Sequence, residues 1–410
     1  MALVLLQTVI PVDLLLMVIS LIIIVGFLSE AIFRRTRIPE VLILMFIGLL
    51  LGPIGSLMPQ NYISLLREMT PLFGTIALVM IMFNSGKIMK FSGKKKLRGS
   101  WGIVLAFADF AIPAAIMPFV MYYLLGWPLI YGALLGIILG ETSTIMVLPF
   151  IRKLRISPEF YNMEVNETTF NSVFSILAFY FLLLVIQGGT FTVSSYVQYA
   201  LSYISIAVFI GLIGGFGWLL VRNIIKAARN YLATISIAIL IYGIVDLLSA
   251  SAVVSVLIFA IIIGNAKVLN RYLNLRHDGG REESKEIENG LEFLVKTFFF
   301  VFIGIITILS INYFIYGLII VAILIVTRYG QVFGLYRNGD RRYRGLLFSL
   351  LPRGLAVAVL SSTLYSIGGV YNTEIFYICS IMLILTNIAF AILASRSAST
   401  RDIRSSDKRG

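Results

Sequence analysis

Thirteen apolar segments, each close to the length that crosses a bilayer, follow one another along the 410 residues of this chain. A membrane helix needs about 20 mostly apolar residues, because each residue advances only about 1.5 Å. The segments cover approximately 12–34, 39–54, 68–88, 100–125, 128–152, 158–186, 196–222, 231–249, 251–268, 287–310, 313–334, 345–366 and 375–395. With 59% hydrophobic residues and a mean hydropathy of +0.96, the composition lies far outside the soluble range. We therefore expect an all-α polytopic membrane protein with about 13 transmembrane helices.

The basic residues predict how these helices are oriented. Nearly all of the 33 Lys and Arg residues flank alternate loops or lie in the C-terminal tail, whereas the loops on the other side hold only Arg67. Basic loops stay in the cytoplasm, so we expect a multi-pass cell-membrane protein with its N-terminus outside and its C-terminus inside. Because topology and anionic lipid account for the net charge of +13, no nucleic-acid partner is expected.

The connections between the segments are short, which leaves no room for a separate soluble domain. Residues 1–395 are expected to form one transmembrane domain, followed by a polar cytoplasmic tail at 396–410. The tail is too short and too hydrophilic to bury a core.

Ionisable side chains inside the apolar segments are costly and are therefore candidates for function. Five of them fall in the middle half of their segments and could share one polar centre: Asp109, Glu141, Glu167, Arg328 and Arg353. Four others lie nearer the cytoplasmic ends, where snorkelling or the i, i+4 spacing of Glu292 and Lys296 offers a simpler explanation. These four are Glu30, Glu164, Glu292 and Lys296.

Two segments contain residues that interrupt a helix. The fifth carries Gly140 followed by "ETST", and the twelfth carries Pro352, Arg353 and Gly354. Unwound backbone at membrane depth persists only where it lines a buried or wet cavity, and paired broken helices indicate a transporter that binds substrate near the midplane. We expect inverted repeats whose broken helices cross there, with a core bundle at about 100–186 and 313–395. The alternative is an intact fifth helix with back-bonded Thr and Ser, and a simple kink at Pro352.

Several motifs in their order resemble the cation/proton antiporter superfamily of sodium/proton and potassium/proton exchangers. They are "IPEVLILMFIGLLLGP", "TSTIMVLPFIRKL", "ETTFNSVFSIL", "FFFVFIG", the intramembrane Arg328 and "PRGLAVAVL". The resemblance covers almost the whole chain. It implies a homodimer in which a core bundle moves against a dimerisation bundle by alternating access.

The resemblance also assigns roles in the sixth segment. Glu167 matches the family glutamate, which pairs with the basic residue of the eleventh segment, here Arg328. Asn171 matches the family asparagine, and Ser172 occupies the position of the transport aspartate. A serine hydroxyl coordinates but does not titrate near neutrality, so another carboxylate must bind the proton if exchange is coupled.

Three carboxylates are candidates for this role. Glu141 lies beside the break in the fifth segment, where a carboxylate without a cationic partner would hold a proton more readily. It could instead be neutralised by Arg353 or by a helix N-terminus. Glu167 fits a buried brace with Arg328, and Asp109 is the third candidate.

The donor atoms favour a hard monovalent cation, Na⁺ or K⁺, held by carboxylate and hydroxyl oxygens. The predicted cation ligands are Thr142, Asn171, Ser172 and Glu141, and the ion and proton pathway adds Ser143, Glu167 and Asp109, with Arg328 and Arg353 balancing charge. His277 is the only histidine, and no phosphate-binding loop is present, so we expect neither an enzyme nor a cofactor. The predicted function is secondary exchange of a monovalent cation for protons. The alternative is an antiporter fold without coupled proton exchange: a uniporter, another carrier or a membrane sensor.

Overall fold

In the computed structural model, the described residues are 12–36, 38–55, 60–89, 100–154, 156–187, 193–225, 230–272, 283–337 and 339–399. Most of the C-terminal tail and His277 lie outside them. The described part of the chain contains helices and no strand. The first half comprises α1 (Val12–Thr36), α2 (Glu40–Leu49), η1 (Leu50–Ile54), α3 (Gln60–Ile88), α4 (Ser100–Leu125), α5 (Leu129–Leu139), α6 (Thr144–Arg152), α7 (Pro158–Gln187) and α8 (Val193–Ile224).

The second half continues the same all-helical arrangement. It comprises α9 (Tyr231–Leu247), α10 (Ala252–Gly264), α11 (Ala266–Tyr272), α12 (Glu283–Ile306), α13 (Ile311–Tyr329), η3 (Gly330–Leu335), η4 (Arg341–Tyr343), α14 (Arg344–Ser349), α15 (Leu355–Ile367) and α16 (Val370–Ser399). Each of the thirteen predicted segments coincides with one helix or with a pair of consecutive helices.

Lengths and composition agree with this assignment. Among the described residues, eight helical segments are long and apolar enough to cross a membrane, and the bent pair α10 and α11 makes a ninth. Four shorter apolar helices account for the remaining predicted segments. The predicted polytopic all-α fold is therefore confirmed. The 67° bend between α10 and α11 was not predicted, because the sequence there reads as one apolar run.

The fifth and twelfth predicted segments are both broken where the sequence indicated. The fifth is divided into α5 and α6 by the non-helical residues 140–143, and the twelfth into α14 and α15 by residues 350–354. The alternative of an intact fifth helix and a kinked twelfth is therefore wrong. Both breaks are buried, and each interrupts the backbone hydrogen bonding of its helix.

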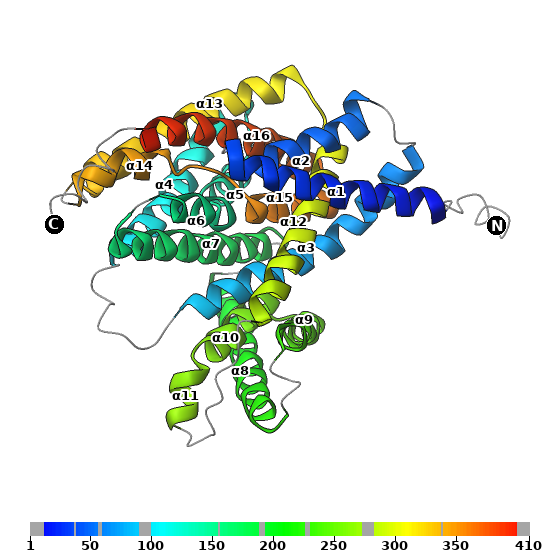
Figure 1. The fold of residues 1–410 in the computed structure, drawn as a ribbon, viewed down its shortest axis with the longest axis vertical. Helices are drawn as coiled ribbons and strands as arrows, with labels where there is room; N and C mark the ends of the chain where they lie inside the picture. The colour runs from blue at the N-terminus through cyan, green and yellow to red at the C-terminus, as the bar shows by residue number, and fades with distance from the viewer. Residues whose placement is uncertain are drawn as a thin grey trace.

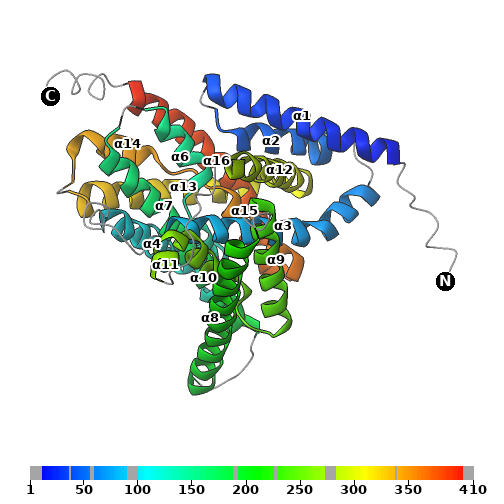
Figure 2. The ribbon, with the colours of Figure 1, turned by 60° about the horizontal axis from the view of Figure 1, so that its bottom comes forward.

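Helices from both halves of the chain pack around these breaks. The helix α4 packs against α5 and α7, and α16 packs against α13, α14 and α15 (Figure 1). On the other side, α10 packs against α3, α8 and α9, while α12 packs against α1, α2 and α3. Figure 2 shows α8 and α9 projecting away from α1 and α2. This arrangement accommodates the predicted core bundle at 100–186 and 313–395, which stays a prediction.

Glycines bring α5 close to α4. A Cβ on Gly136 would lie 2.3 Å from the carbonyl oxygen of Pro113, and one on Gly140 would lie 3.0 Å from that of Asp109. Small residues allow helix backbones in membranes to approach this closely. The close contact places the end of α5, and therefore the first break, directly beside α4.

Candidate ion-binding site

The two broken helices meet at their breaks. The backbone N–H of Ser143 donates to the carbonyl oxygen of Pro352 over 2.9 Å, which joins the first break to the second. A Cβ on Gly354 would lie only 2.0 Å from Ser143 Oγ, so glycine permits this close approach. The hydrogen bond satisfies backbone groups that the interrupted helices leave without partners.

Asn171 of α7 holds the first break in place. Its Oδ1 accepts a 2.7 Å hydrogen bond from the backbone N–H of Thr142. Its Nδ2 donates to the carbonyl oxygens of Gly140 (3.0 Å) and Ala106 (3.2 Å). One buried amide thus connects α7, the break and α4. The amide predicted as a cation ligand is largely occupied by backbone groups.

Ser172 lies next to Glu141. The Ser172 Oγ is 2.9 Å from Glu141 Oε1 and 3.0 Å from the carbonyl oxygen of Thr168. Both side chains are buried, each with 2% of its surface exposed. The other carboxylate oxygen, Oε2, makes no hydrogen bond to any residue that the structure describes. At the position where the resemblance implies the transport aspartate, a hydroxyl is therefore bonded to a carboxylate from the first break.

Arg353 lies at the second break but does not bond to the Glu141 carboxylate. Its NH1 donates to the backbone carbonyl of Glu141 (2.7 Å) and to Thr142 Oγ1 (2.9 Å). The carbonyl oxygen of Arg353 accepts from Asn387 of α16 at 2.8 Å, and its N–H donates to Thr386 Oγ1 at 3.3 Å. The guanidinium therefore stabilises the unwound backbone by hydrogen bonds, while its charge also acts on the Glu141 carboxylate.

Asp109, Glu167 and Arg328 form a second buried group. Arg328 NH1 donates to Asp109 Oδ2 over 2.7 Å and to Glu167 Oε1 over 2.6 Å. The Nε and NH2 atoms donate to the carbonyl oxygen of Leu347. The pairing of Glu167 with Arg328 agrees with the one that the resemblance implies. The five predicted mid-span charges are thus divided between an Arg328 group and a Glu141 group.

Two buried charges were missed or misinterpreted from the sequence. Glu164 is 0% exposed, so its interpretation as a snorkelling side chain is wrong. Its helix, α7, is covered at this point by neighbours that the linear sequence does not reveal. Lys296 donates to Glu40 of α2, a residue the sequence did not single out as a partner. The sequence signal for this partner was Glu40 itself, an acid that directly follows Pro39 at the start of an apolar segment.

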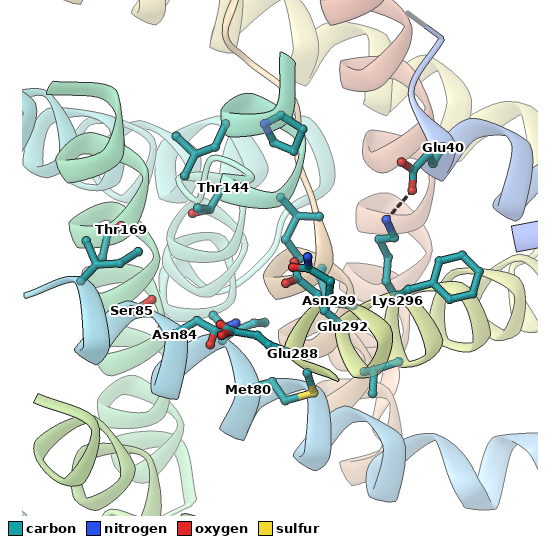
Figure 3. A pocket seen from close by; sticks show the side chains of 18 of the residues that line it. Glu40, Met80, Asn84, Ser85, Thr144, Thr169, Glu288, Asn289, Glu292 and Lys296 are labelled. Carbon is teal, nitrogen blue, oxygen red and sulfur yellow. Dashed lines mark hydrogen bonds and ion pairs between the residues drawn. The ribbon is translucent and has the colours of Figure 1, made fainter. Parts of the chain in front are cut away.

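A cavity of about 730 Å³ opens beside these groups. Figure 3 shows Asn84, Ser85, Thr144 and Thr169 along its wall, with Glu288, Glu292 and the Glu40–Lys296 pair around it. Thr144 is the first residue of α6, directly after the break, and Thr169 is three residues before Ser172. The cavity therefore reaches helix turns adjacent to the Glu141–Ser172 pair.

A family model described as "Sodium/hydrogen exchanger, transmembrane" matches residues 18–395. The chain belongs to the sodium/hydrogen exchanger family. The Na(+)/H(+) antiporter 1 of Methanocaldococcus jannaschii is 25% identical over 363 residues, which cover 84% of this chain and 82% of that protein.

Solved structures match the fold as well. The sodium proton antiporter MjNhaP1 from M. jannaschii at pH 8 superposes with a TM-score of 0.75 at 21% identity, covering 95% of this chain and 99% of that one. A second structure of MjNhaP1, from electron microscopy, gives a TM-score of 0.74 at 22% identity, with coverage of 97% and 99%.

The family confirms what the sequence predicted about function. This exchanger is a multi-pass membrane transporter and not an enzyme, and its predicted class, secondary exchange of cations for protons, is supported. The alternative of an antiporter fold without coupled proton exchange is not favoured.

Proposed function

We propose that this chain exchanges Na⁺ for protons at the Glu141–Ser172 pair, by alternating access of a core bundle within a homodimer. The family favours Na⁺ over K⁺. The observation that supports this site is a buried carboxylate that is bonded to a hydroxyl, beside two broken helices, with one oxygen free of hydrogen bonds to described residues. The basic loops support an N-terminus outside and a C-terminus in the cytoplasm.

The Ser172 hydroxyl can serve Glu141 in both protonation states. When Glu141 is ionised, the hydroxyl donates to Oε1; when Glu141 carries a proton, the carboxyl donates to Ser172 Oγ and the hydroxyl turns to the carbonyl of Thr168. A monovalent cation and a proton then compete for the same carboxylate. Either ligand neutralises a charge that would be costly to leave buried alone.

The surrounding groups position the ligands and do not supply the titrating atom. Asn171 and Arg353 fix the backbone around Thr142, and Ser143 ties the two breaks together. We expect the cation to reach Glu141 from the cavity that Thr144 and Thr169 line. Asp109 and Glu167, held by Arg328, act as a brace between α4, α7 and α13.

Proteoliposomes with an internal pH dye test this function. Pulses of Na⁺, K⁺ or Li⁺ should dissipate a preset pH gradient, most strongly with Na⁺, and Glu141→Gln should abolish the signal. Glu159→Gln, an exposed acid on α7, is the matched control and should retain it. Absence of proton movement with every cation in the wild type would refute exchange, and retained exchange in Glu141→Gln would refute this site.

The variant Ser172→Asp restores the family residue and provides a second test in the same proteoliposome assay. Two carboxylates within hydrogen-bond distance bind a shared proton tightly. The cation must then displace a more firmly held proton, so half-maximal exchange should move to higher pH. An unchanged pH profile would show that position 172 does not contact the titrating group.

A further inference from the structure

Glu164 is a buried carboxyl that the transport site does not use. It lies in α7, three residues before Glu167, and no part of its side chain is exposed. Neither Oε1 nor Oε2 has a hydrogen-bond partner among the described residues. The charged groups that interact with it include Arg328 of α13, Asp109 of α4 and Glu167 of its own helix. The side chain therefore belongs to the Arg328 group.

This group has more acids than its base can pair. The charge of Arg328 interacts with Asp109, Glu164 and Glu167. Its NH1 donates to Asp109 and Glu167, and its Nε and NH2 donate to the Leu347 carbonyl. Three ionised carboxylates would leave two negative charges unbalanced. An unpaired charge in low dielectric is so costly that the group takes up a proton instead.

Among the residues that the structure describes, neighbouring elements supply no second base for Glu164. Tyr336, after η3, is a neutral phenol that interacts with Glu164 and Glu167. Arg353 acts on Asp109, but its guanidinium donates to the first break, at the Glu141 carbonyl and Thr142 Oγ1. In the described part of the chain, the charge of Glu164 is thus compensated only through an arginine that two other acids already engage.

Glu164 differs from the other two acids in its hydrogen bonds. Asp109 and Glu167 each accept a short hydrogen bond from Arg328, which stabilises their ionised forms, whereas Glu164 accepts none. Glu164 is six residues from the start of α7 at Pro158, or about 9 Å along the helix. Ser172 lies two further turns inside. Glu164 therefore lies nearer the start of α7 than Ser172 does.

We propose that Glu164 is a proton-binding site, separate from the Glu141–Ser172 pair. It is neutral while Asp109 and Glu167 share Arg328, and on ionisation it releases its proton to the bulk water and competes with them for the guanidinium. Ionisation then weakens the brace that Arg328 makes between α13, α4 and α7. That Glu164 binds a proton does not depend on the proposed function. The effect of this proton on exchange does rest on the proposed function.

Infrared spectroscopy of the purified protein measures this proton directly. A protonated carboxyl has a C=O stretch that a carboxylate lacks, and amide groups absorb elsewhere. At neutral pH, Glu164→Gln should lose one such band that the wild type and Glu159→Gln retain. An identical band in wild type and Glu164→Gln would overturn the proposal. Glu164→Asp keeps the carboxyl and provides a second test, because the band should shift in frequency; an unshifted band would also overturn the proposal.

Thermal unfolding against pH tests the competition for Arg328. The melting temperature of the wild type should fall on alkalinisation, as Glu164 ionises, and that of Glu164→Gln should fall less over the same range. Parallel curves would overturn the proposed link. Exchange in proteoliposomes separates the two proposals: loss of exchange in Glu141→Gln concerns the transport site, whereas Glu164→Gln should retain exchange with a flatter alkaline pH profile. An unchanged profile would overturn the effect on exchange alone.

Discussion

Ser172 Oγ lies 2.9 Å from Glu141 Oε1, so a hydroxyl on α7 contacts a carboxylate at the end of α5. The family aspartate expected at position 172 is absent, yet an acid is present within hydrogen-bond distance of that position. The acid reaches the same place from the neighbouring broken helix. In the proposed site, this carboxylate is the group for which a cation and a proton compete.

Removing the hydroxyl should weaken cation binding. In Ser172→Ala, the buried Glu141 carboxylate loses the hydrogen-bond donor that stabilises its ionised form. A proton then competes more strongly with Na⁺ for this carboxylate. A hydrogen bond to a charged group contributes about 1.5–3 kcal/mol, equivalent to about tenfold to a hundredfold in affinity. We expect the Na⁺ concentration for half-maximal exchange to rise by about tenfold or more. Ser172→Thr, which keeps the hydroxyl, should change it far less, and equal effects of both variants would contradict this role.

Removing the Asn171 amide should destabilise the first break. In Asn171→Ala, the N–H of Thr142 and the carbonyls of Gly140 and Ala106 lose their partner. Each buried polar group left without a partner costs about 1–3 kcal/mol. We expect a lower melting temperature in detergent together with loss of exchange. Asn223→Ala, on α8, is a control that should keep exchange. If Asn171→Ala were as stable as the wild type, Asn171 would not hold the first break in place.

Breaking the Arg328 brace should destabilise the protein, and removing the acids with it should restore part of the loss. Arg328→Met leaves Asp109 and Glu167 buried without their guanidinium. Removing one partner of a buried ion pair costs about 3–5 kcal/mol. The triple variant Arg328→Met, Asp109→Asn, Glu167→Gln should melt at a higher temperature than Arg328→Met alone. Equal melting temperatures would show that Arg328 does not stabilise the protein by compensating the charges of Asp109 and Glu167.

Outside the membrane-spanning segments, Asp340 should give stability that depends on acid pH. The side-chain hydrogen bond from Arg342 holds the pKa of the Asp340 carboxyl below its ordinary value. A carboxyl whose pKa is lowered by folding stabilises the protein above its unfolded pKa, and this contribution disappears as pH falls through the folded pKa. Asp340→Asn should therefore melt slightly below the wild type at neutral pH, by a small amount because the pair is exposed. The two melting curves should converge in acid, and a constant difference would contradict this account.

The amino-acid sequence determined the helices and the breaks. Apolar runs of bilayer length predict spans without reference to neighbours, and Gly140, Pro352 and Gly354 interrupt a helix through their own backbone properties. The loss of the aspartate at Ser172 was also visible, because a side chain's capacity to titrate belongs to the residue itself.

Only the tertiary structure decided which charges meet. The rotation of a helix and the height of its neighbours fix whether Glu141 reaches Ser172 or Arg353, and neither follows from spacing along one segment. Glu164 shows this most clearly, since its distance from the helix start suggested an exposed end, whereas it is fully buried in a helix that α4 packs against. Local sequence sets what each side chain can do chemically, but burial and partners depend on residues that are far apart along the chain.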